Sequence, residues 1–146
     1  MEDITYFIES LKEKGLKITS PRFTISRLLL DCTKHPSAED IYTQVLEVHP
    51  GISFTTVYKN LKTFADLGLI DELSIDPERI RYDPNTTPHY HSLCWKCGSI
   101  RDHFPDNGSA PLSSNEKSLN GFKVKKIQVH FRGICPGCSE EPGYQI

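Results

Sequence analysis

The chain has 146 residues, of which 37% are hydrophobic and 25% are charged, and its formal net charge at pH 7 is -2. This length and composition fit a globular protein of one long or two short domains, and no apolar run is long enough to cross a membrane. A slightly acidic chain has no overall attraction for nucleic acid, so any DNA binding must use a local basic surface.

Amphipathic helices are predicted in the first half of the chain, because apolar residues recur there at helical spacing between helix-breaking residues. They are expected over residues 4–14 before Gly15, from Ser20, from Ser37 and from Ser53 to Gly68. Ser37 also opens a run that resembles a capping box, with an acidic residue three positions later. Two short apolar runs follow at 70–75 and 79–82, and the turn residues between them predict a hairpin.

Helices followed by a small hairpin are typical of a winged helix, in which the helix before the hairpin enters the major groove of DNA. The outward face of the fourth helix, with basic residues nearer the N-terminus, gives the candidate DNA contacts: Lys14, Lys17, Arg22, Thr55, Thr56, Tyr58, Lys59 and Lys62. Tyr58 and the threonine methyls can contact thymine methyls, and the basic residues can reach phosphates or guanine. An ordinary solvated helix face would look the same, so that alternative stays open.

Two Cys-x-x-Cys pairs indicate a zinc site in the second half of the chain. They supply four thiolates suited to a tetrahedral structural Zn²⁺, from Cys94, Cys97, Cys135 and Cys138. Such an ion would tie the C-terminal segment to the rest of its domain. Two disulfides are the alternative. The chain shows no signal peptide, so we expect it in the reducing cytoplasm, where zinc is favoured over disulfides.

A second group of possible metal ligands lies near the middle of the chain. His89 and His91 alternate with Tyr90, so in a strand both imidazoles lie on one face. Asp83 precedes this pair and Asp102 follows it. Imidazoles with carboxylates suit Fe²⁺, Mn²⁺ or Zn²⁺. A His-x-His pair is also common on ordinary surfaces, and a zinc hydrolase that uses these residues with bound water is an alternative of another class.

The last part of the chain predicts a helix over residues 112–120 and then a strand over 121–133, in which apolar residues alternate. The second half therefore has α+β character. A small domain with a strongly apolar strand benefits from a partner, so we expect a homodimer.

Short motifs along nearly the whole chain together resemble the ferric uptake regulator (Fur) family of metal-dependent repressors. They are Thr19-Ser-Pro-Arg22, the run from His35 to Tyr42, the run from Ile52 to Leu61, Arg81-Tyr-Asp83, the run from His89 to Cys94, Gly121-Phe122 and the second cysteine pair. The resemblance implies a winged-helix DNA-binding domain at 1–82, a hinge at 83–88, and an α/β dimerisation and metal-binding domain at 89–146. It also implies double-stranded operator DNA as a partner, and a regulator without catalytic residues rather than an enzyme.

Within the family the chain most resembles the peroxide-sensing (PerR) branch, because Asp83 and Asp102 stand where iron sensors tend to have Glu. The resemblance implies a regulatory Fe²⁺ or Mn²⁺ ion with five ligands, His35, Asp83, His89, His91 and Asp102. It further implies that iron and peroxide oxidise His35 or His89, and that the oxidised repressor releases its operator. A repressor that senses the level of iron or zinc, and whose metal simply dissociates, is the alternative within the family.

Overall fold

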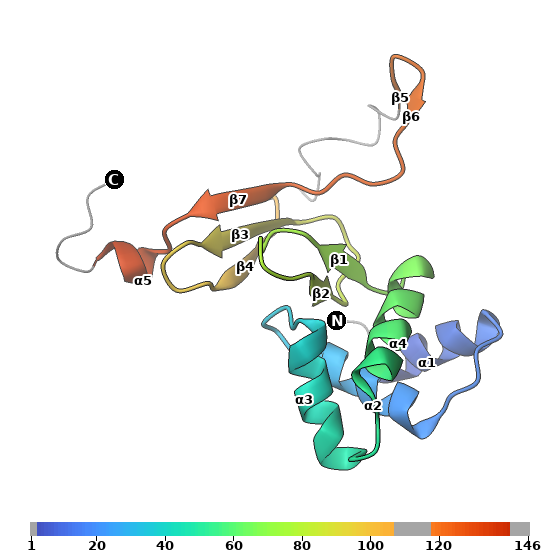
Figure 1. Ribbon diagram of the computed structural model, residues 1–146. Coiled ribbons are helices and arrows are strands. Elements are labelled where there is room, and N and C mark those ends of the chain that lie inside the picture. Colours follow the sequence, from blue (N-terminus) through green and yellow to red (C-terminus); the bar gives the residue numbers. More distant parts are fainter. Residues whose placement is uncertain (1–2, 107–117, 141–146) are drawn as a thin grey trace. The chain divides into compact units, whose positions relative to one another are not determined.

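Figure 1 shows the computed structural model, in which residues 3–106 and 118–140 are described. The chain divides into two compact units, residues 1–86 and residues 87–146. Within the described ranges, no helix is long and apolar enough to cross a membrane.

Helices and a small hairpin make up the described part of the first unit. They are α1 (Ile4–Glu13), α2 (Ser20–Asp31), α3 (Ala38–Val48), α4 (Phe54–Asp66), β1 (Asp71–Leu73) and β2 (Arg81–Asp83). β1 and β2 pair antiparallel, with Leu73 opposite Arg81. This order of helices and hairpin confirms the predicted winged helix (Figure 1).

The helices begin and end where the sequence signals predict. Ser37 accepts a hydrogen bond from the N–H of Asp40 at 3.2 Å, and the Asp40 carboxylate accepts one from the N–H of Ser37 at 2.9 Å. The predicted capping box is therefore confirmed at the start of α3. At the start of α4 the hydroxyl of Ser53 accepts the N–H of Thr56, and a side-chain cap of this kind contributes about 1 kcal/mol. Gly15 and Gly68, which follow α1 and α4, both have positive φ, a conformation that ends helices.

The core of the first unit is formed by the apolar faces of its helices. Phe7 of α1 and Phe64 of α4 are fully buried and meet edge to face, with ring centroids 5.2 Å apart. Further fully buried side chains come from α2, α3 and α4: Ile25, Leu29, Ile41, Val45, Val57 and Leu61. Burying a side chain of this size contributes about 1.5–3 kcal/mol. This packing fixes which face of α4 points inward and leaves the opposite face to solvent.

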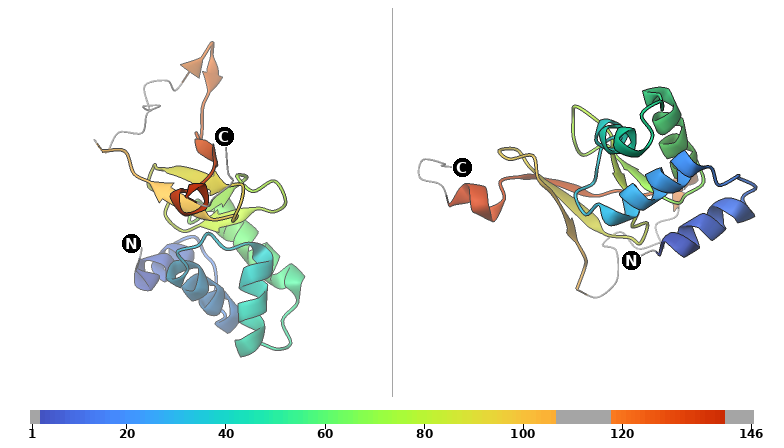
Figure 2. Two further views of the ribbon diagram at one scale, coloured as in Figure 1. Left: turned by 90° about the vertical axis from the view of Figure 1, so that its left-hand side faces the viewer. Right: turned by 90° about the horizontal axis from the view of Figure 1, so that it is seen from below.

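Strands and a short helix make up the described part of the second unit. They are β3 (Tyr90–Cys94), β4 (Ile100–His103), β5 (Ser118–Leu119), β6 (Phe122–Lys123), β7 (His130–Gly133) and α5 (Pro136–Ser139). One sheet has the strand order β4-β3-β7, in which β3 is antiparallel to β4 and parallel to β7 (Figures 1 and 2). β5 and β6 form a separate hairpin. Together with the first unit, this confirms the predicted α+β class.

The region between β4 and β7 differs from the sequence prediction. Residues 112–117 of the predicted helix lie outside the described residues, and Ser118–Leu119 form a strand instead. Asn120 and Gly121 have φ values of 49° and 86° and make the two-residue turn between β5 and β6. The predicted strand over 121–133 is interrupted, because residues 124–129 belong to no strand. Asn-Gly strongly favours a hairpin turn, so local turn chemistry outweighed the apparent helical and strand periodicity.

Candidate metal centres and nucleic-acid interface

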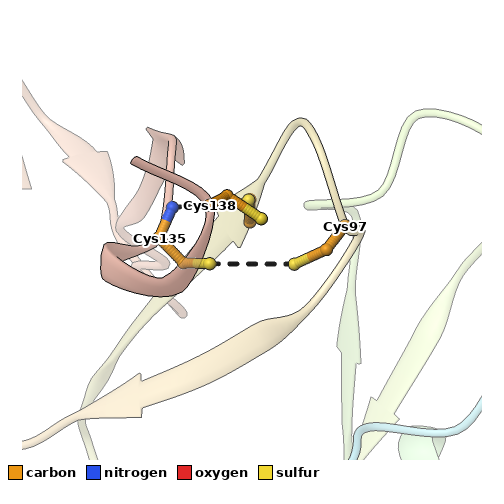
Figure 3. A group of neighbouring side chains, drawn as sticks. Cys97, Cys135 and Cys138 are labelled. Carbon is orange, nitrogen blue, oxygen red and sulfur yellow. Dashed lines mark hydrogen bonds between the residues drawn. The ribbon is translucent and has the colours of Figure 1, made fainter. Parts of the chain in front are cut away.

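The cysteines of the two pairs come together in the second unit. Cys94 ends β3, Cys97 follows in the next turn, Cys135 precedes α5 and Cys138 lies within it. Their sulfur atoms lie within 4.8 Å of one another, and the sulfurs of Cys97 and Cys135 are 3.8 Å apart (Figure 3). Tetrahedral zinc with Zn–S bonds of about 2.3 Å spaces its sulfurs by about 3.8 Å. The cysteines are free thiols, so the cluster fits zinc and not a pair of disulfides.

Tight turns and strand pairing bring the two cysteine pairs together. Gly98 adopts a φ of 72° and donates its N–H to the carbonyl of Cys94 at 2.9 Å. This tight turn brings the side chains of Cys94 and Cys97 to the same side of the chain. The N–H of Trp95 bonds to the carbonyl of Gly133 at 2.8 Å and so continues the pairing of β3 with β7. This register places Cys135, two residues after Gly133, next to the first pair.

Hydrogen bonds make the thiols of the cluster unequal. The backbone N–H groups of Cys135 and Cys97 donate to the Cys94 sulfur, the former at 3.3 Å, and lower the pKa of Cys94 to about 6. A hydrogen bond with Cys135 and then burial raise the pKa of Cys138 to about 12. Because zinc binds thiolates, its uptake must release the proton that Cys138 otherwise keeps at neutral pH.

His35 and Asp83 lie close together in the first unit and offer two possible metal ligands. Nε2 of His35 lies 3.5 Å from Oδ2 of Asp83, and both side chains are buried. The other oxygen of Asp83 accepts the N–H of Asn85 at 2.8 Å, which fixes the carboxylate. His35 has a φ of 50°, in the left-handed region, where a non-glycine residue is strained by about 1–3 kcal/mol. Such strain persists only where neighbouring groups hold the residue in place.

Arg81 of β2 holds the loop that carries His35. Its guanidinium pairs with the carboxylate of Asp76 at 2.9 Å and donates to the backbone carbonyl of His35 at 3.3 Å. The N–H of the next residue, Tyr82, donates to the carbonyl of Pro36 at 2.9 Å. β2 therefore carries Asp83 at its end. It also fixes the backbone carbonyls of His35 and Pro36, two successive residues of the loop that precedes α3.

Two carboxylates keep Arg81 in place at neutral pH. Burial raises the pKa of Asp40, but hydrogen bonds from Ser37 and the charge of Arg81, 3.6 Å away, outweigh it and lower that pKa. Burial likewise raises the pKa of Asp76, and the N–H of Glu78 together with Arg81 lowers it overall. Both carboxylates are therefore charged well below neutral pH.

His89, His91 and Asp102 form a donor group in the second unit. Nε2 of each histidine lies 3.4 Å from the same oxygen, Oδ1 of Asp102, and the two rings have centroids 4.4 Å apart. The strand register explains this, since His91 on β3 lies opposite Asp102 on β4. Nδ1 of His89 lies 2.6 Å from the carbonyl oxygen of Thr87. A carbonyl oxygen can only accept, so Nδ1 carries a proton, and Nε2 is the nitrogen of this ring that faces Asp102 and could bind a metal.

His130 on β7 is a neighbour that the sequence patterns did not reveal. It lies opposite His91 in parallel register, and the two rings meet edge to face with centroids 5.8 Å apart. Burial lowers the pKa of His130, and the nearby His91 and Arg132 lower it further. Its position depends on pairing between β3 and a strand far along the chain, so only the register brings it to this donor group.

Most of the predicted DNA contacts lie on the exposed face of α4. The exposed residues are Thr55, Thr56, Tyr58, Lys59 and Lys62. The ring of Tyr58 stacks on Phe54 with centroids 6.4 Å apart, and Phe54 meets Tyr42 edge to face at 5.6 Å. Lys62 forms an ion pair with Asp66 at 2.7 Å, which raises the pKa of Lys62. The face therefore presents an ordered aromatic side chain and two lysines.

Arg22 differs from the other predicted contacts because its guanidinium is used inside the first unit. Nε of Arg22 donates to Oδ1 of Asn60 on α4 at 2.8 Å, and Nη1 donates to the carbonyl of Lys17 at 2.5 Å. Asn60 in turn donates to the carbonyl of Thr56 at 2.9 Å. Arg22 thus ties the start of α2 to α4. The side chains of Lys14 and Lys17 are exposed.

A winged helix together with a four-thiol zinc cluster and imidazole and carboxylate donors defines a metal-dependent transcription regulator. The chain belongs to the ferric uptake regulator family, whose model matches residues 13–132. The resemblance drawn from the sequence motifs is therefore confirmed.

Relatives of the chain include peroxide regulators. The chain is 36% identical over 138 residues to the peroxide operon regulator of Bacillus subtilis strain 168, and 94% of each chain is covered. It is 30% identical to the solved Campylobacter jejuni peroxide stress regulator, with a TM-score of 0.69, and 90% of this chain and 98% of that chain are covered. It is also similar to the ferric uptake regulator from Francisella tularensis with iron, at 27% identity and a TM-score of 0.67, covering 86% and 96%.

The donor atoms present fit two kinds of metal. The four sulfurs of the cysteine cluster fit a structural zinc ion in number and in spacing. The His and Asp groups offer imidazole nitrogens and carboxylate oxygens, which fit iron or manganese as a regulatory ion.

Proposed function

We propose that this protein is a dimeric, metal-dependent repressor that senses hydrogen peroxide and then releases its operator DNA. The observation that carries the proposal is the convergence of His89 and His91 on one oxygen of Asp102, in a chain similar to a peroxide operon regulator. Imidazole and carboxylate donors suit Fe²⁺, an ion able to reduce peroxide. The four clustered cysteines would bind the structural zinc ion and so would not serve as ligands of this iron.

One regulatory ion is proposed to bind donors from both units, and its ligands are His35, Asp83, His89, His91 and Asp102. The first unit offers two of these donors and the second offers three, whereas such ions take roughly four to six ligands. An ion shared in this way favours the arrangement of the two units in which all its ligands meet. We infer that this arrangement is the one that binds DNA, so metal binding and DNA binding are coupled.

Peroxide acts in this proposal by modifying a ligand. A bound Fe²⁺ would activate the peroxide, and the two electrons that reduce it would come in the end from the imidazole ring of His35 or His89. One peroxide oxygen would add to a ring carbon and the other would leave as water, so each event adds a single oxygen atom to the protein. Both side chains are almost fully buried, at 4% and 2% exposed, so an oxidant generated beside them meets these rings before solvent. The oxidised ring is a poor donor, the ligand set becomes incomplete and DNA is released.

The exposed face of α4 is proposed to enter the major groove. Thr55, Thr56, Tyr58 and Lys59 would meet base edges, and Lys62, Lys14 and Lys17 would meet phosphates. We assign Arg22 a positioning role, because its hydrogen bonds to Asn60 and Lys17 set the placement of α4.

Dimerisation is proposed through the second unit. Apolar side chains are exposed there by 44–69%, namely Phe104, Phe122, Ile127 and Phe131. Covering this surface with a second copy removes it from water, and two copies present two α4 helices to matching half-sites. A regulator of operator DNA would work in the cytoplasm, which is the location we propose.

The predicted alternatives make different demands. A sensor of iron or zinc level would use the same ligands but would show no histidine oxidation. A zinc hydrolase is disfavoured because the chain belongs to a family of regulators.

Fluorescence anisotropy with a duplex selected from a random-sequence library by Mn²⁺-loaded protein tests the proposal. We expect tight binding with Fe²⁺ or Mn²⁺ and weak binding after the ions are removed. Peroxide should abolish binding of the iron-loaded protein and leave the manganese-loaded protein unaffected. Retained binding by the iron-loaded protein would instead favour a sensor of metal level.

A further inference from the structure

A row of polar side chains crosses one face of the main sheet of the second unit. His91 on β3 pairs in register with Asp102 on β4 and with His130 on β7. Residues that lie opposite one another in register point to the same face of a sheet. Figures 1 and 2 show the three strands side by side. His103, the next residue on β4, points to the other face, where its Nε2 lies 2.7 Å from the hydroxyl of Ser92.

We propose that His130 is a further ligand of the regulatory iron or manganese ion, which it binds through Nε2 from the β7 side of His91. This inference rests on the proposed function, which assigns that ion to His89, His91 and Asp102 among its ligands.

The spacing of the rings allows His130 to share an ion with His91. The ring centroids of His91 and His130 are 5.8 Å apart, against 4.4 Å for His89 and His91. Two imidazoles that bind one ion through bonds of about 2.1 Å can have ring centres up to about 6.5 Å apart. Both pairs fall below this limit. The larger separation corresponds to a wide angle at the ion, so His130 would approach from a different side than His89 does.

Nε2 of His130 has no hydrogen-bond partner in the part of the chain that the structure describes. The atom is buried, and among residues 3–106 and 118–140 none forms a hydrogen bond with it. Leaving a buried polar atom without a partner destabilises the folded protein. An ion bound to this nitrogen would remove that destabilisation. The adjoining imidazole of His91 and carboxylate of Asp102 are donors of the kind that such an ion takes.

The zinc cluster would hold this ligand in place. β7 runs from His130 to Gly133, which pairs with Cys94, and Cys135 follows two residues later. Zinc binding therefore fixes the register that keeps His130 opposite His91. With five other ligands proposed, His130 would complete a six-coordinate ion. Peroxide would then have to compete with the His130 nitrogen for a place on the ion.

Mn²⁺ binding to zinc-loaded, full-length protein tests this role without any peroxide chemistry. Electron paramagnetic resonance of Mn²⁺ gives the free-ion concentration, and pulsed measurements of the bound ion give its couplings to nitrogen. The variants are His130→Ala and His130→Phe, of which the second keeps an aromatic ring against His91. His103→Ala is the matched control, because it removes a histidine from the other face of the same sheet. Zinc content and thermal unfolding establish that each variant is folded.

We expect both His130 variants to bind Mn²⁺ at least about tenfold more weakly, the lower end of the range for residues that support a metal. They should also lose one nitrogen coupling, whereas His103→Ala should match the unmodified protein within about twofold. Unchanged affinity and couplings in folded His130→Phe would overturn the inference and leave the proposed function standing. Weaker binding with all nitrogen couplings retained would also overturn it, because His130 would then only support His91. Failure of the unmodified protein to bind Mn²⁺ would instead contradict the proposed function itself.

Discussion

The two sets of metal donors are built in different ways. The cysteine sulfurs gather within the second unit, where paired strands and tight turns place them around one point. The histidine and aspartate donors are divided, with His35 and Asp83 in the first unit and His89, His91 and Asp102 in the second. A centre contained in one unit can act as a permanent part of its fold. A centre whose ligands come from two units can report on, and control, how those units are arranged.

The largest expected effect comes from removing a ligand of the cysteine zinc cluster. We expect Cys94→Ser or Cys135→Ser to abolish zinc binding, because the thiolates act together and structural zinc contributes on the order of 10 kcal/mol to folding. The second unit should then lose its ordered sheet and its ability to dimerise. Zinc analysis and analytical ultracentrifugation measure both effects. Cys32→Ser, outside the cluster, should keep zinc and the dimer, and a zinc-bound dimer of Cys94→Ser would contradict this account.

Asp102→Asn should weaken the proposed His and Asp metal centre and leave the cysteine zinc cluster intact. Asp102 faces both His89 and His91, so its neutralisation removes one charged donor and alters the setting of two more. We expect Mn²⁺ affinity to fall by about 10- to 100-fold while zinc stays bound. Mn²⁺ titration beside zinc analysis is the measurement, with Asp106→Asn as the matched control, because Asp106 is an exposed aspartate shortly after β4. Coupled loss of both metals would show that the two centres are not independent.

Arg81→Met should weaken the support beneath the first-unit donors. The ion pair with Asp76 and the bond to the His35 carbonyl are lost, which should destabilise the first unit by about 1–2 kcal/mol at pH 7. The pKa values of Asp40 and Asp76 are lowered in the folded state, so their stabilising effect is complete above about pH 5 and is lost as pH falls below about 4. The difference between Arg81→Met and the unmodified protein should therefore shrink in acid.

Urea unfolding at pH 7 and pH 3.5 measures this dependence. Arg79→Met is an informative comparison, because the exposed Arg79 lies in the same hairpin and also lowers the pKa of both carboxylates through its charge, so it should show a smaller effect in the same direction. A stability difference that stays constant across this pH range would show that the carboxylates are not what Arg81 stabilises.

The smallest effect is expected from Ser37→Ala at the start of α3. The substitution removes the hydroxyl that caps the helix immediately after the loop of His35, and it should cost about 1 kcal/mol. Urea unfolding gives the cost, and Mn²⁺ titration shows whether a loosened loop also weakens the regulatory ion. Ser53→Ala at α4 is the matched cap away from that loop. Equal Mn²⁺ affinity in the two variants would mean that the cap of α3 does not help to place His35.

Features with a local cause were predicted well from the sequence. The capping box at Ser37, the helix end at Gly68 and the sulfur cluster of Cys94 all follow from residues close together or from a strict ligand spacing. The hairpin at Asn120 and Gly121 also has a local signal, the Asn-Gly dipeptide, which was outweighed by apparent periodicity in the flanking residues.

Features that depend on pairing between distant segments could not be read from the chain. The bond from Arg81 to the His35 carbonyl spans a loop, two helices and a hairpin, and the place of His130 depends on the parallel register of β3 and β7. Likewise, the internal use of Arg22 by Asn60 becomes visible only once α2 and α4 are packed. From the sequence alone, a basic residue such as Arg22 in a winged helix is predicted to contact DNA, and only the folded structure shows that its guanidinium bonds to Asn60 instead.

Mass spectrometry of intact protein and of its peptides tests the central claim, peroxide sensing at a regulatory histidine, most directly. Protein loaded with Fe²⁺ is treated with modest peroxide beside a Mn²⁺-loaded control, and DNA binding is followed in the same samples. We predict one added oxygen on the peptide that contains His35 or His89, with iron and not with manganese, together with loss of DNA binding. Unmodified histidines in iron-loaded protein that still binds DNA would contradict the account.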